Sequence, residues 1–169
     1  MRIPAICLWQ PYADLVVHGF KKYETRHWAH GGPSGVTAIH ATKRWTNAEK
    51  RMVRSPLFIE ACSEMWGFDW NLEPCTPPLQ CVVGLVVWGD AISTDVIRPK
   101  LIANDNHSEL AFGNYELGRF AHALNGHHAF AEPIPVPGKQ SKKWYWDVPE
   151  NLAETVKKFC ADHGVKPPC

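Results

Sequence analysis

The sequence lacks a strong net charge, a long apolar run and an internal repeat. Its 18 Lys and Arg residues nearly balance its 17 Asp and Glu residues, which argues against strong non-specific binding to duplex nucleic acid. The longest apolar run, residues 81–89, is about half as long as a membrane-spanning helix requires. Near the N-terminus, Pro4, Pro11 and Asp14 interrupt what would be the apolar core of a signal peptide. We therefore expect a cytoplasmic protein that has no membrane partner.

Common metal and cofactor motifs are absent too. None of the six cysteines forms a Cys-x-x-Cys pair, so we expect free thiols rather than disulfides or a zinc site. The pair His27-x-x-His30 can bring two imidazoles together, but no further ligand follows at zinc spacing. Glycine-rich phosphate loops, the GxSxG nucleophile motif and the HExxH zinc motif do not occur. We therefore predict no metal and no cofactor.

The length and composition favour one domain. The chain has 169 residues, of which 45% are hydrophobic, and this suits a single core over residues 3–148 with a C-terminal helix at 149–163. Predicted strands do not alternate strictly with predicted helices. This order favours the α+β class, with a small, mainly antiparallel β-barrel or curved sheet and flanking helices.

Local patterns place the expected elements. Apolar or alternating stretches predict strands at 5–9, 23–28, 36–41, 81–92, 118–124, 127–134 and 144–146. Helices are expected from Pro11 to about Gly19, from Thr46 to about Arg54, where Glu49 completes a capping box, and from Pro56 to Trp66. Asp147 can cap the C-terminal helix. Asn125-Gly126 predicts a hairpin turn, and residues 93–117 are expected to be mostly loop.

The stretch KKYETRHW, residues 21–28, is too polar for a core strand. Strand alternation places Glu24, Arg26 and Trp28 on one face, beside Lys21 at the junction before the strand. Lys21 and Glu24 either run acid–base chemistry as a buried pair or form an ordinary ion pair. Arg26 either binds phosphate or is neutralised by Glu24. Trp28 either stacks a base or closes the core.

A second group of candidates follows the strand predicted at 36–41. Lys43 and Arg44 are suited to phosphate contacts, and they lie in a basic N-terminal third that holds nine Lys and Arg residues against three Asp and Glu. The alternative is an ordinary solvated face. His40 either contacts a ligand from the strand end or is satisfied by the backbone.

Three further residues complete the candidates. Gln10 either reads a base edge or caps the end of a helix or sheet. In the segment GNYELGR, two glycines allow a tight backbone path, so that Tyr115 and Arg119 can enter a cleft. The alternative for Arg119 is a structural salt bridge, because acidic stretches lie on either side of it.

Three ordered motifs resemble the ASCH domain family. They are LWQPYADLVVHGFKKYETRHW (8–28), VTAIHATKRW (36–45), and FGNYELGRFAHAL (112–124) followed by EPIPVPGKQSKKWYW (132–146). The resemblance covers about residues 3–148. It implies a PUA-like, mainly antiparallel β-barrel with flanking helices and a cleft, and an association with RNA recognition.

The same resemblance implies a possible chemistry. A short-chain branch of the family hydrolyses acetylated cytidine with a lysine, a threonine three residues later and a distant glutamate. Lys21 matches the lysine, whereas Glu24 occupies the threonine position and Thr25 lies one residue further on. The distant carboxylate falls near Asp90, at the end of the strand predicted at 81–92.

Two functions follow as expectations. The first is binding of single-stranded RNA or of a small modified nucleoside or nucleotide through Gln10, Arg26, Trp28, His40, Lys43, Arg44 and Arg119. The second is a metal-independent hydrolase of RNA phosphodiesters or of acylated nucleosides such as N4-acetylcytidine, with Lys21, Glu24 and Tyr115 as catalytic residues. The sequence gives no oligomeric state.

Overall fold

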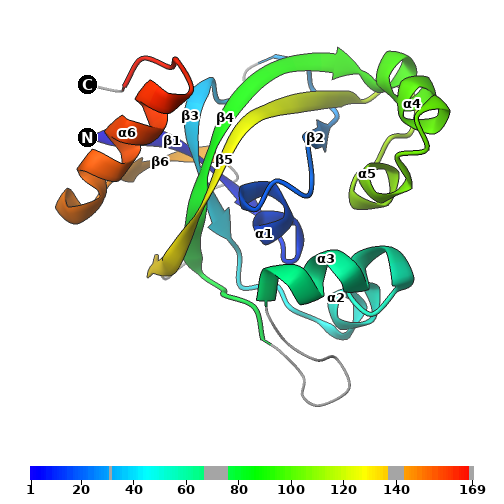
Figure 1. Ribbon diagram of the computed structural model, residues 1–169, viewed down its shortest axis with the longest axis horizontal. Coiled ribbons are helices and arrows are strands. Elements are labelled where there is room, and N and C mark those ends of the chain that lie inside the picture. The colour runs from blue at the N-terminus through cyan, green and yellow to red at the C-terminus, as the bar shows by residue number, and fades with distance from the viewer. Residues whose placement is uncertain (31, 67–75, 137–142, 168–169) are drawn as a thin grey trace.

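The long strands β4 and β5 lie at the centre of one sheet (Figure 1). The computed structural model describes residues 1–30, 32–66, 76–136 and 143–167, and its strand order is β2-β5-β4-β3-β1-β6. The strands are β1 (Arg2–Leu8), β2 (Tyr23–Arg26), β3 (Gly35–Ala41), β4 (Cys81–Ser93), β5 (Phe120–Pro135) and β6 (Lys143–Asp147). The helices are α1 (Tyr12–Val17), α2 (Asn47–Met52), α3 (Pro56–Trp66), α4 (Thr94–Ala103), α5 (His107–Phe112), the 3-10 turn η1 (Glu150–Leu152) and α6 (Ala153–Asp162).

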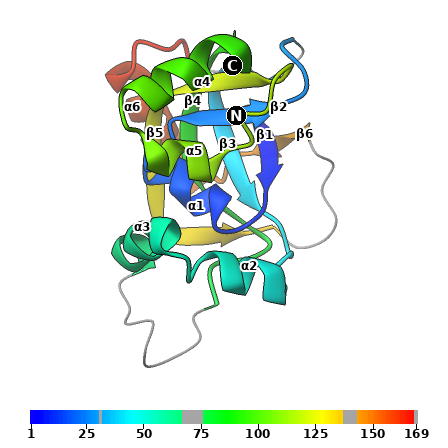
Figure 2. The same cartoon turned by 90° about the vertical axis from the view of Figure 1, so that its right-hand side faces the viewer.

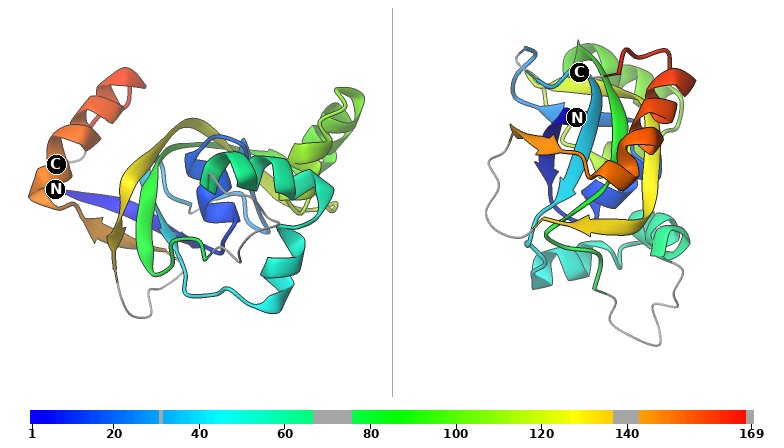
Figure 3. Two further views of the ribbon diagram at one scale, coloured as in Figure 1. Left: turned by 60° about the horizontal axis from the view of Figure 1, so that its bottom comes forward. Right: turned by 90° about the vertical axis from the view of Figure 1, so that its left-hand side faces the viewer.

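The sheet confirms the α+β class but is not a closed barrel. β1 pairs with β3 in parallel, and all other neighbours are antiparallel. Within the described residues the four-residue strand β2 pairs with β5 and β6 pairs with β1, so the two edges are not joined. The predicted barrel closure is therefore wrong for the described chain, although β4 and β5 bend strongly around α1 (Figure 3).

Apolar residues on both faces of β4 explain the layers. Val83, Val86 and Trp88 pack with Ala13, Val16 and Val17 of α1, whereas Val82 and Leu85 pack with Phe159 of α6. Figure 2 shows α1 between α5 above and α2 and α3 below. The predicted strand that is buried on both faces is thus confirmed, and its two faces hold α1 and α6 against opposite sides of the sheet. No helix in the described part of the chain is long and apolar enough to cross a membrane.

The predicted hairpin at Asn125-Gly126 is wrong. Residues 120–135 form one strand, in which Val87 of β4 pairs with Gly126 and Trp88 pairs with Leu124. Asn125 is therefore an extra residue in a bulge rather than part of a turn. Close packing explains the glycine, because a Cβ at Gly126 would lie 2.4 Å from Cδ2 of His163.

Two other boundaries differ from expectation. The segment expected to be a loop, 93–117, contains α4 and α5, which begin at the side-chain caps Ser93 and Asn106. The C-terminal helix α6 begins at Ala153 rather than near Asp147, because Asp147 pairs with Arg2 in the β1–β6 ladder. The capping box of α2 is confirmed: the Thr46 side chain accepts a hydrogen bond from the Ala48 N–H, and Glu49 accepts one from the Thr46 N–H.

Candidate functional site

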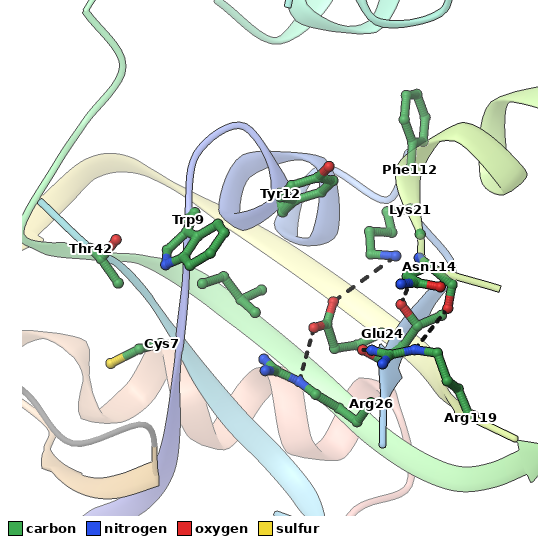
Figure 4. A pocket seen from close by; sticks show the side chains of 13 residues that line it. Cys7, Trp9, Tyr12, Lys21, Glu24, Arg26, Thr42, Phe112, Asn114 and Arg119 are labelled. Atoms are coloured by element: carbon green, nitrogen blue, oxygen red, sulfur yellow. Dashed lines mark hydrogen bonds and ion pairs between the residues drawn. The ribbon is translucent and has the colours of Figure 1, made fainter. Parts of the chain in front are cut away.

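A pocket of about 460 Å³ opens beside the N-terminus of α1 (Figure 4). This size suits a small-molecule ligand. One part of its lining is aromatic, and another is charged or polar. The aromatic residues are Trp9, Tyr12 and Phe112, and the charged or polar ones include Lys21, Glu24, Arg26, Asn114 and Arg119.

The chain between α1 and β2 directs Lys21 into this pocket. α1 is almost entirely buried and ends before Gly19, whose φ of +78° lets the chain reverse without a Cβ penalty. The Lys21 N–H then donates to the Leu15 carbonyl at 3.0 Å. The reversal places Lys21 against the buried side of the pocket, and β2 carries Glu24 and Arg26 next to it.

Lys21 is a buried cation between two carboxylates. Its side chain is 2% exposed, and Nζ lies 4.0 Å from Oε2 of Glu24 and 3.9 Å from Oε1 of Glu109. No described residue accepts a hydrogen bond from Nζ. Burial lowers the pKa of Lys21, while the two glutamates act in the opposite direction. The ammonium group therefore retains unused hydrogen-bonding capacity at the pocket.

Glu109 was not identified from the sequence, yet it organises this region. It is also 2% exposed. Its carboxylate accepts hydrogen bonds from the Lys22 N–H at 2.6 Å, the Tyr23 N–H at 3.3 Å and the Tyr115 hydroxyl at 2.6 Å. Burial and the nearby Glu109 carboxylate raise the pKa of Tyr115 well above its usual range. Tyr115 therefore lies behind the pocket as a hydrogen-bond donor to Glu109.

Two arginines bring further positive charge to the pocket. Arg26 Nε lies 3.0 Å from Glu24 Oε1, an ion pair whose angles do not make a hydrogen bond. Arg119 donates to the carbonyls of Asn114 at 3.2 Å and Thr25 at 3.5 Å, and no salt bridge within the described chain includes it. Within the described chain the Arg119 guanidinium thus meets carbonyl oxygens but no carboxylate, so its charge is not neutralised there, which favours an anionic ligand.

At the rim of the pocket, the Arg44 guanidinium stacks on the Trp9 ring. The Trp9 side chain is 47% exposed, and Cζ of Arg44 lies 3.6 Å from the centre of its ring. Arg44 Nε in turn donates to Oε1 of Glu49 at 2.7 Å. Burial acts to raise the pKa of Glu49, but hydrogen bonds from Thr46 and Arg44 hold it at about 2. Lys43 is exposed beside this stack.

Five predicted binding residues do not line the pocket: Gln10, Trp28 and His40, and also Lys43 and Arg44 at the rim. Gln10 is fully buried, where its amide donates to the Pro78 carbonyl at 3.0 Å and accepts from the Asp14 N–H at 3.2 Å. His40 is buried with its ring nitrogens near Cys7 Sγ and the Val136 carbonyl, and burial lowers its pKa. β2 ends at Arg26, so Trp28 leaves the strand face and stacks near Trp88 instead.

The remaining sequence predictions concern Asp90, Thr25 and metal binding. Asp90 is exposed and lines a different pocket, together with His30 and His122, so it does not meet Lys21. Thr25 does line the pocket of Lys21, and its hydroxyl oxygen accepts from the Asn114 N–H at 3.0 Å. Among the described residues, no group of three His, Cys, Asp or Glu side chains could hold a metal ion.

Comparisons with known proteins find solved structures that resemble this chain at low sequence identity. No protein-family model matches the chain, and no curated protein matches it. Solved structures similar to it include ASCH from Zymomonas mobilis, with 14% identity over 98% of this chain and 82% of that one and a TM-score of 0.45. A mutant of the same protein has 13% identity over 92% and 94% of the two chains and a TM-score of 0.47. These identities and TM-scores are too low to assign a role to any residue of this chain.

Proposed function

We propose that the pocket binds a nucleotide unit, either within single-stranded RNA or as a free, modified nucleoside or nucleotide. The observation that carries this proposal is Lys21: a buried ammonium group that finds no hydrogen-bond acceptor among the described residues and lines a pocket of nucleotide size. A group of this kind is costly to bury unless a ligand completes its contacts. An anionic oxygen would do so.

The surrounding charge supports a phosphate or an anionic transition state. Arg26 and Arg119 offer planar, forked donors, and Lys21 adds a compact charge. Glu24 and Glu109 offset part of this charge. The three cations exceed the two carboxylates, so a singly or doubly charged phosphate is compatible with the site.

Hydrolysis of an acylated nucleoside or of RNA is the second candidate, and one observation favours it. Lys21 lies about equally far from two carboxylates, and its pKa is lowered by burial. A neutral Lys21 can accept a proton from an attacking water molecule. With N4-acetylcytidine, the water oxygen would add to the acetyl carbonyl, and Arg26 would stabilise the oxyanion. The C–N bond would then break as the protonated Lys21 returns its proton to the leaving cytidine amine. The products are cytidine and acetate.

Calorimetric titration tests the ligand binding that both proposed functions require. The ligands are CMP, a single-stranded RNA oligonucleotide and N4-acetylcytidine, each with and without a chelator. The proteins are wild type, Lys21→Met, and Lys157→Met as a matched control, because Lys157 is exposed on α6. We expect Lys21→Met to weaken CMP binding at least about 10-fold, as expected for a lost charge-assisted hydrogen bond, and Lys157→Met to leave it unchanged.

Product analysis of the same mixtures decides between binding and catalysis. Release of acetate or RNA fragments by wild type, insensitive to chelator and lost in Lys21→Met, would establish the hydrolase. Binding with intact ligands would establish the binding protein. A wild-type protein that retains its thermal unfolding transition but binds none of the three ligands would overturn both proposals.

A further inference from the structure

Trp9 is unusual among the aromatic residues of the pocket because it is exposed. Phe112 is buried in the cluster with Leu15 and Phe58, and the Tyr12 hydroxyl donates to Met52 Sδ at 3.3 Å. Trp9, by contrast, has 47% of its side chain open to solvent. About half of this large ring remains open to solvent and is available for contact with a ligand.

The contact with Arg44 holds the Trp9 ring in its orientation. Arg44 stacks on the ring at 3.6 Å and is held by Glu49, which the Thr46 backbone binds at 2.8 Å. Arg44 is not among the residues that line the pocket, whereas Trp9 is. The Arg44 guanidinium therefore covers one part of the ring from outside the pocket lining, while Trp9 itself lies among the side chains that line the cavity (Figure 4).

We infer that Trp9 is the stacking platform for a nucleobase, with Arg44 as its fixed backing. The inference rests on the proposed nucleotide-binding function and adds which part of the ligand lies where. The base lies on the free part of the Trp9 ring, and the phosphate lies toward Lys21, Arg26 and Arg119. Aromatic stacking is tolerant of base identity, because every base has a π face. The site therefore selects for a base-bearing ligand over a bare sugar phosphate.

The test compares CMP with ribose 5-phosphate, which carries the same phosphate without a base. Dissociation constants are measured by calorimetry for wild type, Trp9→Ala and Trp9→Phe. We expect Trp9→Ala to weaken CMP binding about 10- to 100-fold, the range expected for loss of one stacking contact, and to leave ribose 5-phosphate binding unchanged. Trp9→Phe should restore most of the CMP affinity.

Tyr145 supplies the matched control. It is another exposed ring, 61% exposed, with Arg2 stacked above it at 5.6 Å from the ring centre, and it does not line the pocket. Tyr145→Ala should therefore leave both ligands unaffected. Arg44→Met should weaken CMP binding by about 2- to 5-fold, since the ring loses a cation–π contact that orients it.

The outcomes distinguish this inference from the function on which it rests. If wild type binds CMP and Trp9→Ala binds it equally well, the stacking platform is overturned and nucleotide binding stands. If Trp9→Ala weakens CMP and ribose 5-phosphate equally, Trp9 shapes the pocket without holding a base, and the inference is also overturned. If wild type binds neither ligand, nucleotide binding itself fails.

Discussion

Helices α2 and α5 begin with the same kind of cap, but their first-turn glutamates have different roles near the pocket. Each begins with a polar cap followed three residues later by a buried glutamate: Thr46 with Glu49, and Asn106 with Glu109. Each glutamate acts on a cation of the site. Glu49 binds Arg44 at the rim, and Glu109 lies against Lys21 on the buried side.

The difference lies in what surrounds the two cations. The Arg44 side chain is 42% exposed, so water can replace Glu49 as its partner. Lys21 is buried, and the Glu109 carboxylate also binds two backbone N–H groups that lead into β2. The same cap motif therefore supports a weak, solvent-exposed ion pair between Glu49 and Arg44 at the rim. On the buried side it supports the Glu109 carboxylate, whose contacts the fold cannot lose without a large cost in stability.

The largest expected effect is that of Glu109→Ala. Removal of this carboxylate leaves the Lys22 and Tyr23 N–H groups and the Tyr115 hydroxyl without their acceptor and Lys21 without one of its two nearby carboxylates. We expect a loss of about 3–5 kcal/mol in the free energy of unfolding. Glu49→Ala should cost about 1–2 kcal/mol, because Arg44 stays hydrated. Urea unfolding of both variants measures the contrast, and equal losses would contradict it.

Acid titration should show a second difference. The pKa of Glu49 is about 2 in the folded protein against an ordinary value of 4.5. A depressed pKa means that the stabilisation is complete above about pH 4.5 and is lost as the pH falls toward 2. We expect about 1–2 kcal/mol to disappear over this range in wild type, discounted for the exposed partner. Glu49→Gln should lack this part of the slope, whereas Lys157→Met should retain it.

The comparison also shows what the sequence could predict. Thr46-x-x-Glu49 was interpreted as a helix start, and the structure confirms it. Asn106-x-x-Glu109 has the same spacing, but it lies in the polar run NDNHSE, whose composition predicts a loop. Pro99 is tolerated inside α4. The cap spacing of Asn106 and Glu109 is the sequence signal that indicates α5, and the polar composition of the run obscures it.

Most of the predicted pocket residues come from one short segment, and Arg119 is the distant exception. Lys21, Glu24 and Arg26 lie within six residues of each other, and the structure brings them to one pocket with Arg119. Trp28 was expected beside Glu24 and Arg26, but β2 stops at Arg26 and Trp28 packs near Trp88, which is distant in sequence. The exposed ring at the pocket is that of Trp9 instead. Strand alternation holds only as long as the strand continues, and the sequence does not show where β2 ends.

The caps Thr46 and Asn106 should contribute similarly to the free energy of unfolding but differ in their effect on ligand affinity. Thr46→Ala and Asn106→Ala should each cost about 1 kcal/mol, which corresponds to a decrease of about 2–4 °C in Tm for a chain of this size. Asn106→Ala should also weaken CMP binding a few-fold, because Glu109 holds the backbone next to Lys21. Thr46→Ala should leave ribose 5-phosphate binding unchanged. If Thr46→Ala does change ribose 5-phosphate binding, the contact between Arg44 and Trp9 at the rim acts on the phosphate site as well.

The smallest effect is expected for Arg44→Lys, which separates the two contacts of Arg44. A lysine can retain the ion pair with Glu49 but cannot stack a planar group on Trp9. The acid-dependent loss of stability should therefore persist, and the free energy of unfolding should fall by less than about 1 kcal/mol. The indole N–H resonance of Trp9, assigned by its absence in Trp9→Phe, should shift. Arg2→Lys, beneath the similar ring of Tyr145, should leave that resonance in place. If Arg44→Lys instead removes the acid slope while the Trp9 resonance is unchanged, Arg44 acts through Glu49 alone, and the rim and the buried side differ less than their contacts indicate.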